Sequence, residues 1–243
     1  MIPGLVILAG MIKLILRGGW GGLKSVSARN VGGIPRPTVD GARTEDGRMT
    51  DETMKERLTR SAFELFSAQG FREVSLDAVA AHAGVTKGAI YSNYQSKKEL
   101  ILDTCQYYYR LWDERMAVLC YTDRDPVGRL RQALLLSTEQ CLFSATNRLF
   151  TSEIFAMAIQ DEDIRRSWSA FFDHNRDFYT SLIRAIVEKE KRNIAFPERN
   201  AEWLLSAFEG LKQRALFEPA LAELGQMGTV VEHLMEIAIA ENT

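Results

Sequence analysis

The sequence predicts an all-α protein in which an N-terminal three-helix domain precedes a larger C-terminal helical domain. Three observations lead to this prediction. Apolar residues recur at helical spacing over long stretches, residues typical of helix caps begin several of these stretches, and glycines end the early ones. The 243 residues include only six prolines, too few to interrupt helices of this length. A chain of this size can bury a sizeable core.

The composition is that of a globular protein, with 46% hydrophobic and 26% charged residues. The three cysteines, Cys105, Cys120 and Cys141, are too few and too scattered for a disulfide framework or a zinc cluster. We expect buried thiols in a reducing cytoplasm, with a redox-sensing pair as the alternative. No metal site, cofactor or catalytic residue is predicted.

Charge is uneven along the chain. Residues 1–48 carry 7 basic and 3 acidic side chains, residues 49–100 carry 7 of each, and residues 101–243 carry 16 basic and 22 acidic. A chain that is acidic as a whole can bind nucleic acid only through a small local patch.

The first 48 residues differ from the rest. An apolar run of about fifteen residues, interrupted by Lys13, is short for a membrane span, and basic residues do not precede it as they would in a secretory signal. The Gly-, Arg- and Pro-rich segment that follows predicts disorder. Since Met49 directly precedes the first clear helix, we interpret residues 1–48 as an extension created by the choice of start site. A short membrane-associating tail is the alternative.

Residues 49–96 predict a compact three-helix domain. In the first helix, apolar residues at helical spacing form one stripe, and Gly70 is a natural C-terminal stop. Ser75 is a candidate N-cap for a short second helix, which Gly84 ends. Thr86 is a candidate N-cap for a third. Two short helices joined by a glycine-containing turn of three or four residues predict a helix-turn-helix, with Ile90 filling the gap between them.

A long helix follows this domain. Ser96 and Glu99 have the spacing of a capping box, and the helical pattern then continues to Cys120, about 24 residues. A helix of that length extends from the small domain into the predicted larger domain, residues 97–243.

The segment AFELFSAQGFREVSLDAVAAHAGVTKGAIYSNYQSKKELI resembles the DNA-binding domain of the tetracycline-repressor (TetR) family of bacterial transcriptional regulators. The resemblance covers residues 53 to about 102 and is specific in its FxxxG, A-x-x-x-G-V, G-x-I-Y and S-K-x-x-L spacings. One departure is Tyr94, where the family more often has Phe. This change should matter little if the Tyr94 hydroxyl reaches water or a phosphate.

The resemblance implies that the helix at 86–94 lies in the major groove of an operator. Thr86 would donate to a phosphate at the helix N-terminus, and Lys87 would approach guanine acceptors on the base edges. Tyr91 would pack on a sugar with its hydroxyl on a phosphate, while Tyr94 packs inward. The implied DNA-binding residues are Ser75, Thr86, Lys87, Gly88, Ala89, Tyr91, Ser92, Asn93 and Lys97.

For the larger domain, the resemblance implies a ligand chamber built by the middle helices. The middle of the chain is rich in aromatic residues and methionine, which suits a small apolar or aromatic ligand, although any one of these residues could simply be core. The candidate ligand-binding residues are Tyr108, Trp112, Met116, Phe143, Phe155, His174 and Phe178.

The resemblance also implies a homodimer formed by the last two helices. Apolar stripes on two faces of the segment at 197–218 agree with this, because such a helix needs two partners. The expected interface residues are Leu204, Phe208, Leu211, Ala215, Met227, Val231 and Leu234. The function implied is that of a ligand-responsive, cytoplasmic repressor that binds a palindromic DNA operator as a dimer.

Two alternatives are a helical enzyme and a structural adaptor without sequence-specific DNA binding. Against an enzyme, the three histidines, His82, His174 and His233, lie on separate helices, and the chain has no nucleophile elbow and no phosphate-binding glycine loop. An adaptor would leave the polar set at 86–93 without a purpose.

Overall fold

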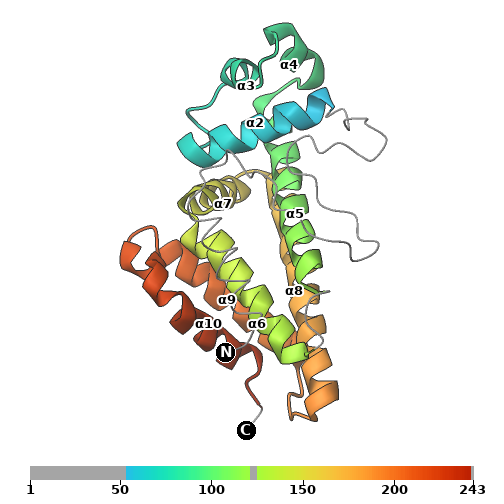
Figure 1. Ribbon diagram of the computed structural model, residues 1–243. Helices are drawn as coiled ribbons and strands as arrows, with labels where there is room; N and C mark the ends of the chain where they lie inside the picture. Colours follow the sequence, from blue (N-terminus) through green and yellow to red (C-terminus); the bar gives the residue numbers. More distant parts are fainter. Residues whose placement is uncertain (1–52, 121–124, 242–243) are drawn as a thin grey trace, which may run out of the picture. The chain divides into compact units, whose positions relative to one another are not determined.

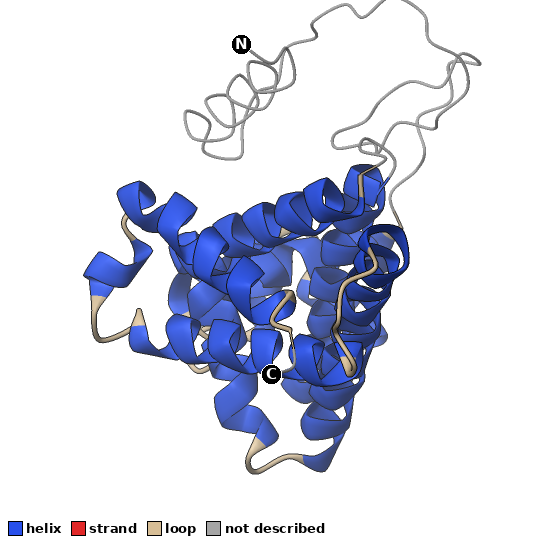
Figure 2. Cartoon of the chain, turned by 90° about the horizontal axis from the view of Figure 1, so that it is seen from below, coloured by secondary structure: helices blue, strands red, loops and turns tan. Residues whose placement is uncertain are grey.

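The computed structural model describes residues 53–120 and 125–241, and every element in these two ranges is a helix (Figures 1 and 2). The predicted extension, residues 1–48, lies outside the described part of the chain. The N-terminal helices are α2 (Met54–Gln69), α3 (Leu76–His82) and α4 (Lys87–Asn93). The longer helices that follow are α5 (Lys97–Cys120), α6 (Pro126–Ser137), α7 (Ala145–Ala158), α8 (Glu162–Glu190), α9 (Pro197–Arg214) and α10 (Met227–Ala238).

The helix boundaries in the N-terminal domain follow from local chemistry. The Ser75 and Thr86 hydroxyls accept hydrogen bonds from the N–H groups of Ala78 and Ala89, which confirms both predicted N-caps. Gly70 and Gly84 have φ values of 82° and 66°, a conformation that side chains with a Cβ rarely adopt. These two glycines therefore end α2 and allow the turn between α3 and α4.

The core of the small domain holds α4 at a fixed angle to α3. Ala80 and Ile90 are buried at the place where α3 and α4 meet. Tyr94 is fully buried, and its hydroxyl lies 3.0 Å from the Thr59 hydroxyl of α2. The expectation that the Tyr94 hydroxyl reaches water or a phosphate is therefore wrong, because Thr59 satisfies it inside the domain.

Helix α5 belongs to both parts of the described chain, as predicted: its first turns pack against α2 and its later turns against α6 and α8 (Figure 1). The Ser96 hydroxyl accepts from the Glu99 N–H, and the Glu99 carboxylate accepts from the Gln95 N–H rather than from Ser96. The first bond of the predicted capping box is therefore present, and the second is made by the N–H of Gln95 instead of the N–H of Ser96.

The stretch 126–143 is not one regular α-helix. Helix α6 continues into a six-residue π-helix, η1 (Thr138–Phe143), before α7 begins. Two side chains at the start of α7 donate hydrogen bonds to backbone carbonyl groups of this segment. The Asn147 amide donates to the carbonyl of Gln140, and the Arg148 guanidinium donates to the carbonyl of Leu142. Two short 3₁₀ turns, η2 (Pro219–Ala222) and η3 (Leu224–Gln226), connect α9 to α10.

Two hydrophobic clusters fill the molecule. One joins the small domain to α7 and the upper parts of α5 and α8, and the other lies among α5, α6, α8, α9 and α10. Phe171 of α8 packs against both. Within the described residues, none of the helices is both long and apolar enough to cross a membrane.

Candidate nucleic-acid interface and ligand cavity

The exposed face of α4 carries most of the predicted DNA-binding residues. Ser75, Thr86, Lys87, Tyr91 and Ser92 are exposed. The two cap hydroxyls accept hydrogen bonds from their own helices, so each keeps its O–H hydrogen to donate to a phosphate. The aromatic ring of Tyr91 is 55% exposed, a large apolar surface that nothing in the described protomer covers.

Lys87 of α4, the helix expected to enter the major groove, forms a salt bridge with Asp77 of α3. Lys87 Nζ lies 2.6 Å from Asp77 Oδ2, and both side chains reach solvent. This hydrogen bond raises the pKa of Lys87 and lowers that of Asp77. Sequence reasoning missed Asp77, although a carboxylate in the first turn of α3 was visible beside Ser75.

The short polar residues of α4 are turned toward their own helix. Ser92 Oγ and Asn93 Nδ2 both donate to the Ala89 carbonyl, at 2.9 and 2.8 Å, and Asn93 is half-buried. Either side chain must rotate to donate to a base. At Gly88 the space that a Cβ would occupy is open apart from the Thr86 hydroxyl, so a DNA backbone can approach closely there.

Lys97 lies at the start of α5 and is half-buried. Its ammonium donates to the Arg72 carbonyl at 3.1 Å, in the turn that precedes α3. Burial lowers the pKa of Lys97, against the carboxylates of Glu73 and Glu153, which raise it. Lys97 is therefore tied to the same edge of the domain as Ser75.

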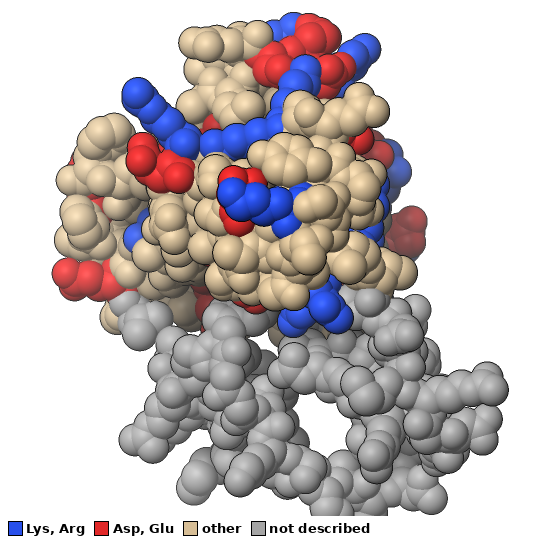
Figure 3. Space-filling view, turned by 90° about the horizontal axis from the view of Figure 1, so that it is seen from above, with Lys and Arg blue, Asp and Glu red and all other residues tan. Residues whose placement is uncertain are grey.

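The helix-turn-helix end of the molecule carries few charges. Figure 3 looks onto this end and shows basic side chains lying singly among uncharged surface, with acidic side chains next to some of them. This agrees with the balanced charge of residues 49–100. A nucleic-acid contact here depends on individual side chains rather than on a broad basic field.

A cavity of about 40 Å³ lies among α5, α6, η1, α8 and α9. That volume admits a few molecules of water size, so a larger ligand requires the surrounding side chains to move. The cavity is lined by Tyr108, Trp112, Leu134, Ser137, Cys141, Trp168, Phe171, Phe172, Asn175, Tyr179, Leu204, Leu205, Phe208, Glu209 and Lys212.

Two of the seven predicted ligand-binding residues, Tyr108 and Trp112, line this cavity. The other five do not. Met116 and Phe178 pack behind it in the second hydrophobic cluster, and Phe143 is half-buried at the end of η1. Phe155 is 45% exposed on the surface of α7.

His174 also lies outside the cavity. It is exposed, and its Nε2 is 2.7 Å from the carboxylate of Asp113 on α5. The His174 ring pairs with this surface acid and lies beside Trp112 of the cavity wall, and its role in orienting a ligand stays a prediction.

Polar groups in the cavity wall were missed by the sequence analysis. Lys212 is buried and its ammonium lies 2.7 Å from Glu209 Oε1, one turn earlier on α9. Lys212 continues the apolar stripe of Leu204 and Phe208 at intervals of four, so a lysine on a buried stripe was the available signal. Asn175 stands in the same way on the aromatic stripe of α8.

The predicted dimer interface is largely internal to one protomer. Leu204, Phe208, Ala215, Val231 and Leu234 are all buried within the single chain, where α9 packs against α8 and α10. Within one protomer the stripe faces the core, and Leu204 and Phe208 line the cavity, so a place at the dimer interface stays a prediction. Leu211 and Met227 are half-buried.

A different apolar surface of the last helices is open to solvent. Trp203 of α9 is 64% exposed, and Leu216 and Phe217, just after the helix, are 42% and 83% exposed. Trp203 lies within α9, whereas Leu216 and Phe217 lie in the turn after its last residue, Arg214. The sequence predicted apolar stripes on two faces of the segment at 197–218. The predicted dimer-interface residues belong to the stripe that faces the core of the protomer.

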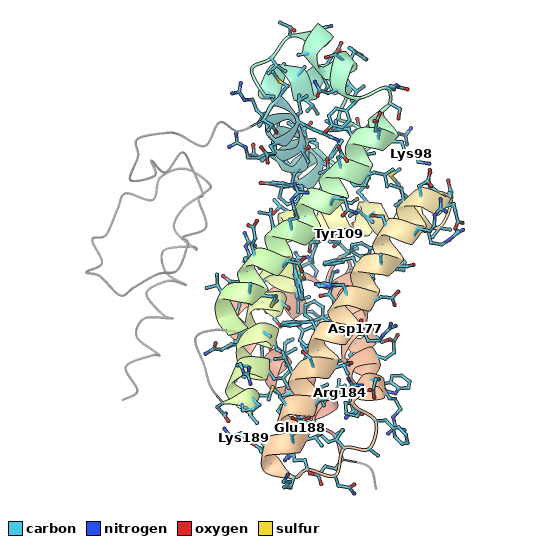
Figure 4. All side chains as sticks on the ribbon, turned by 90° about the vertical axis from the view of Figure 1, so that its right-hand side faces the viewer. Lys98, Tyr109, Asp177, Arg184, Glu188 and Lys189 are labelled. Atoms are coloured by element: carbon cyan, nitrogen blue, oxygen red, sulfur yellow. The ribbon has the colours of Figure 1, made fainter. Side chains whose placement is uncertain are left out.

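Direct contacts join the small domain to the helices that surround the cavity. Lys98, in the first turn of α5, pairs with Asp161 at 2.8 Å and Asp163 at 2.7 Å at the start of α8 (Figure 4). Glu153 of α7 accepts from the Phe71 N–H at 3.0 Å, at the end of α2.

Aromatic packing provides a second connection. Phe150 of α7 is fully buried, with its ring centroid 5.5 Å from Phe71 of the small domain and 5.4 Å from Tyr108 of the cavity wall. Tyr108 in turn lies near Phe171, which lines the cavity from α8.

Comparisons with known proteins agree with this architecture. A model of the family described as "Bacterial regulatory proteins, tetR family" matches residues 58–104. The chain is 37% identical over 54 residues to the uncharacterized HTH-type transcriptional regulator YerO of Bacillus subtilis, covering 22% of this chain and 19% of that protein. It is 24% identical over 185 residues to the HTH-type transcriptional regulator TtgR of Pseudomonas putida, covering 73% and 88%.

Solved structures share the fold. A TetR transcription regulator from Haloarcula marismortui superposes with a TM-score of 0.66 at 16% identity, covering 77% of this chain and 97% of that one. A transcriptional regulator from Saccharomonospora viridis in complex with choline gives 0.62 at 19% identity, covering 75% and 91%. The matches to YerO and to two Pseudomonas putida regulators span only 19–35% of those proteins.

Helices α2, α3 and α4 have the arrangement of a helix-turn-helix DNA-binding domain. Residues 58–104 match the TetR family of transcriptional regulators, and the chain as a whole shares its fold with a solved TetR transcription regulator.

Proposed function

We propose that this protein is a repressor that binds a palindromic DNA operator as a homodimer and releases it when a small apolar or aromatic ligand enters the cavity. The observation that carries the proposal is the exposed face of α4, where Thr86, Lys87 and Tyr91 project from a helix held rigidly by buried Ile90 and Tyr94.

The chemistry of that face suits a major groove. A lysine at the first turn can donate to guanine O6 and N7, and the positive end of the helix favours a phosphate near Thr86. Gly88 leaves room for the backbone to approach, and Ala89 can contact a thymine methyl group once Ser92 and Asn93 turn outward. Lys97 and Ser75 flank the helix as phosphate contacts that set its register.

The dimer is supported by the open apolar surface on α9. Aromatic residues such as Trp203 and Phe217 are enriched at protein interfaces. A symmetric contact through this surface would relate two copies of α4 by a two-fold axis, so that each copy could bind one half of a palindromic site.

Ligand response is supported by the position of the cavity. Its wall includes Tyr108 and Trp112 of α5, the helix whose first turn holds Lys97. A ligand that needs more space than the cavity offers must push on this helix or on Phe171 of α8. It can relieve repression only if it binds the DNA-incompetent arrangement more tightly.

The test is selection of bound sequences from random duplex DNA at fixed salt, followed by anisotropy titrations. We expect a palindrome whose half-sites lie about one turn of B-DNA apart, roughly 34–36 Å. Lys87→Ala should weaken operator binding by about 1–3 kcal/mol and relax one position in each half-site. Failure to enrich any sequence would refute the proposal.

A further inference from the structure

The cavity wall contains a charged pair that apolar packing does not require. The side chain of Lys212 is only 6% exposed and that of Glu209 is 22% exposed, with 2.7 Å between the ammonium and the carboxylate. Taking a charge out of water is costly, and removing one partner of such a pair is more costly still. An apolar residue at either position would fill this space without that cost.

The ammonium of Lys212 has more donors than its partner uses. An ammonium offers three N–H groups, and within the described residues its hydrogen bond goes to Glu209 Oε1. The ammonium also lies 5.9 Å from the centroid of the Trp168 ring, so an aromatic wall borders it on one side. A hydrogen-bond acceptor on a ligand would find donors here.

A second donor in the wall has no partner at all. The indole N–H of Trp168 is buried and makes no hydrogen bond within the described part of the chain, and Trp168 itself is 6% exposed. A buried donor left unsatisfied costs free energy comparable to a lost hydrogen bond. Lys212 and Trp168 therefore each offer an N–H donor to a ligand acceptor in this wall.

We propose that the cavity takes an aromatic carboxylate, with the carboxylate on the Lys212 ammonium in the place that Glu209 now fills and the rings against Trp112, Trp168 and Phe171. This inference rests on the proposed role of the cavity as the ligand site. Glu209 is the more exposed member of the pair, so it can turn toward solvent as the ligand carboxylate arrives.

A cationic ligand fits this wall poorly. Its charge would enter a low-dielectric space beside the buried Lys212 ammonium, where like charges repel strongly. The carboxylate of Glu209 is already neutralised by Lys212, so a cation could use it only by leaving the lysine unpaired. A neutral apolar ligand would gain contacts with the rings and nothing from the two donors.

The test uses aryl-acetates of increasing ring size, each with its primary amide and its matched aryl-ethylamine, titrated by calorimetry against the full chain without DNA. We expect at least one acid to bind about tenfold more tightly than its amide, and the amine more weakly than both. In Lys212→Met the acid should lose this preference, whereas Lys189→Met, an exposed lysine of α8, should keep it.

Glu209→Gln gives an independent readout in case Lys212→Met does not fold. Removing the competing carboxylate should strengthen acid binding severalfold and leave amide binding unchanged. Equal binding of acid and amide, tighter binding of the amine, no binding of any acid, or an unchanged acid preference in Glu209→Gln would each overturn the proposal. Operator affinity is measured separately, so loss of DNA binding would count against the repressor role and not against the carboxylate site.

Discussion

The ammonium of Lys87 lies 2.6 Å from the carboxylate of Asp77, across the turn that joins α3 to α4. The lysine expected to read bases is therefore paired, in the absence of DNA, with an acid from the same motif. In the proposed complex Asp77 would lie near the phosphates that Ser75 contacts. An acid at this position would oppose binding to every sequence and would hold Lys87 in one direction.

Asp77→Asn should raise affinity for random duplex DNA by roughly two- to fivefold, the scale of an exposed charge effect. Operator affinity should rise less, because Lys87 is then less well directed, so the ratio of operator to random binding falls. Anisotropy titrations with both duplexes at one salt concentration measure this. The control is Asp177→Asn, which makes the same charge change at an exposed residue of α8. Unchanged affinity for random DNA in Asp77→Asn would show that this acid does not face the nucleic acid.

Two adjacent lysines at the start of α5 should behave differently. Lys97→Met should weaken binding to all sequences alike and reduce the slope of log affinity against log salt by about 0.9, the contribution of one phosphate contact. Lys98→Met should leave the salt slope unchanged, because Lys98 is held by Asp161 and Asp163 of α8. If Lys97→Met altered sequence preference with an unchanged slope, Lys97 would have a role other than phosphate binding.

Trp203 should lie at the dimer contact. Trp203→Glu would place like charges opposite each other across a two-fold axis, so we expect monomers that lose operator binding. Phe155→Glu makes the same change at an exposed aromatic on α7 and should leave the dimer intact. Light scattering at several protein concentrations reports the oligomeric state. If the Trp203→Glu variant remained dimeric, the dimer interface would have to lie on another surface of the chain.

The sequence predicted best the features that depend on neighbouring residues. The caps at Ser75 and Thr86 and the stop at Gly84 involve groups within a few residues of each other, and the structure contains all of them. Such features need no knowledge of how distant helices pack.

The sequence predicted poorly the features that depend on which face of a helix meets which partner. Helix α9 has two apolar faces, and periodicity cannot say which one turns toward α8 and α10. For this reason Phe208 was assigned to the interface, whereas it lines the cavity. The exposed position of His174 could not be predicted for a similar reason, since its partner Asp113 lies on another helix 61 residues away.

Cys105 and Cys141 should not act as a redox-sensing pair. Both thiols are free and buried, and burial raises the pKa of Cys105 to about 12 and that of Cys141 above its usual value. Because the thiolate is the reactive form, native protein at neutral pH should label slowly with iodoacetamide at both sites, and denatured protein should label fully. Peptide mass spectrometry reads the two residues separately. Rapid native labelling of either would mean that the site opens to solvent.

Phe150 should carry the coupling between the cavity and the DNA-binding domain, since its ring packs between Tyr108 and Phe71. Phe150→Leu keeps the site apolar but removes these ring contacts, at a cost of about 1–2 kcal/mol in the free energy of unfolding. Ligand binding should persist, while the ratio of operator affinities without and with ligand falls severalfold. Ile183→Val, buried in the second cluster, loses comparable stability and should retain the full ratio. If the two variants kept equal ratios, the signal would have to pass instead through α5 or through the Lys98 contact with α8.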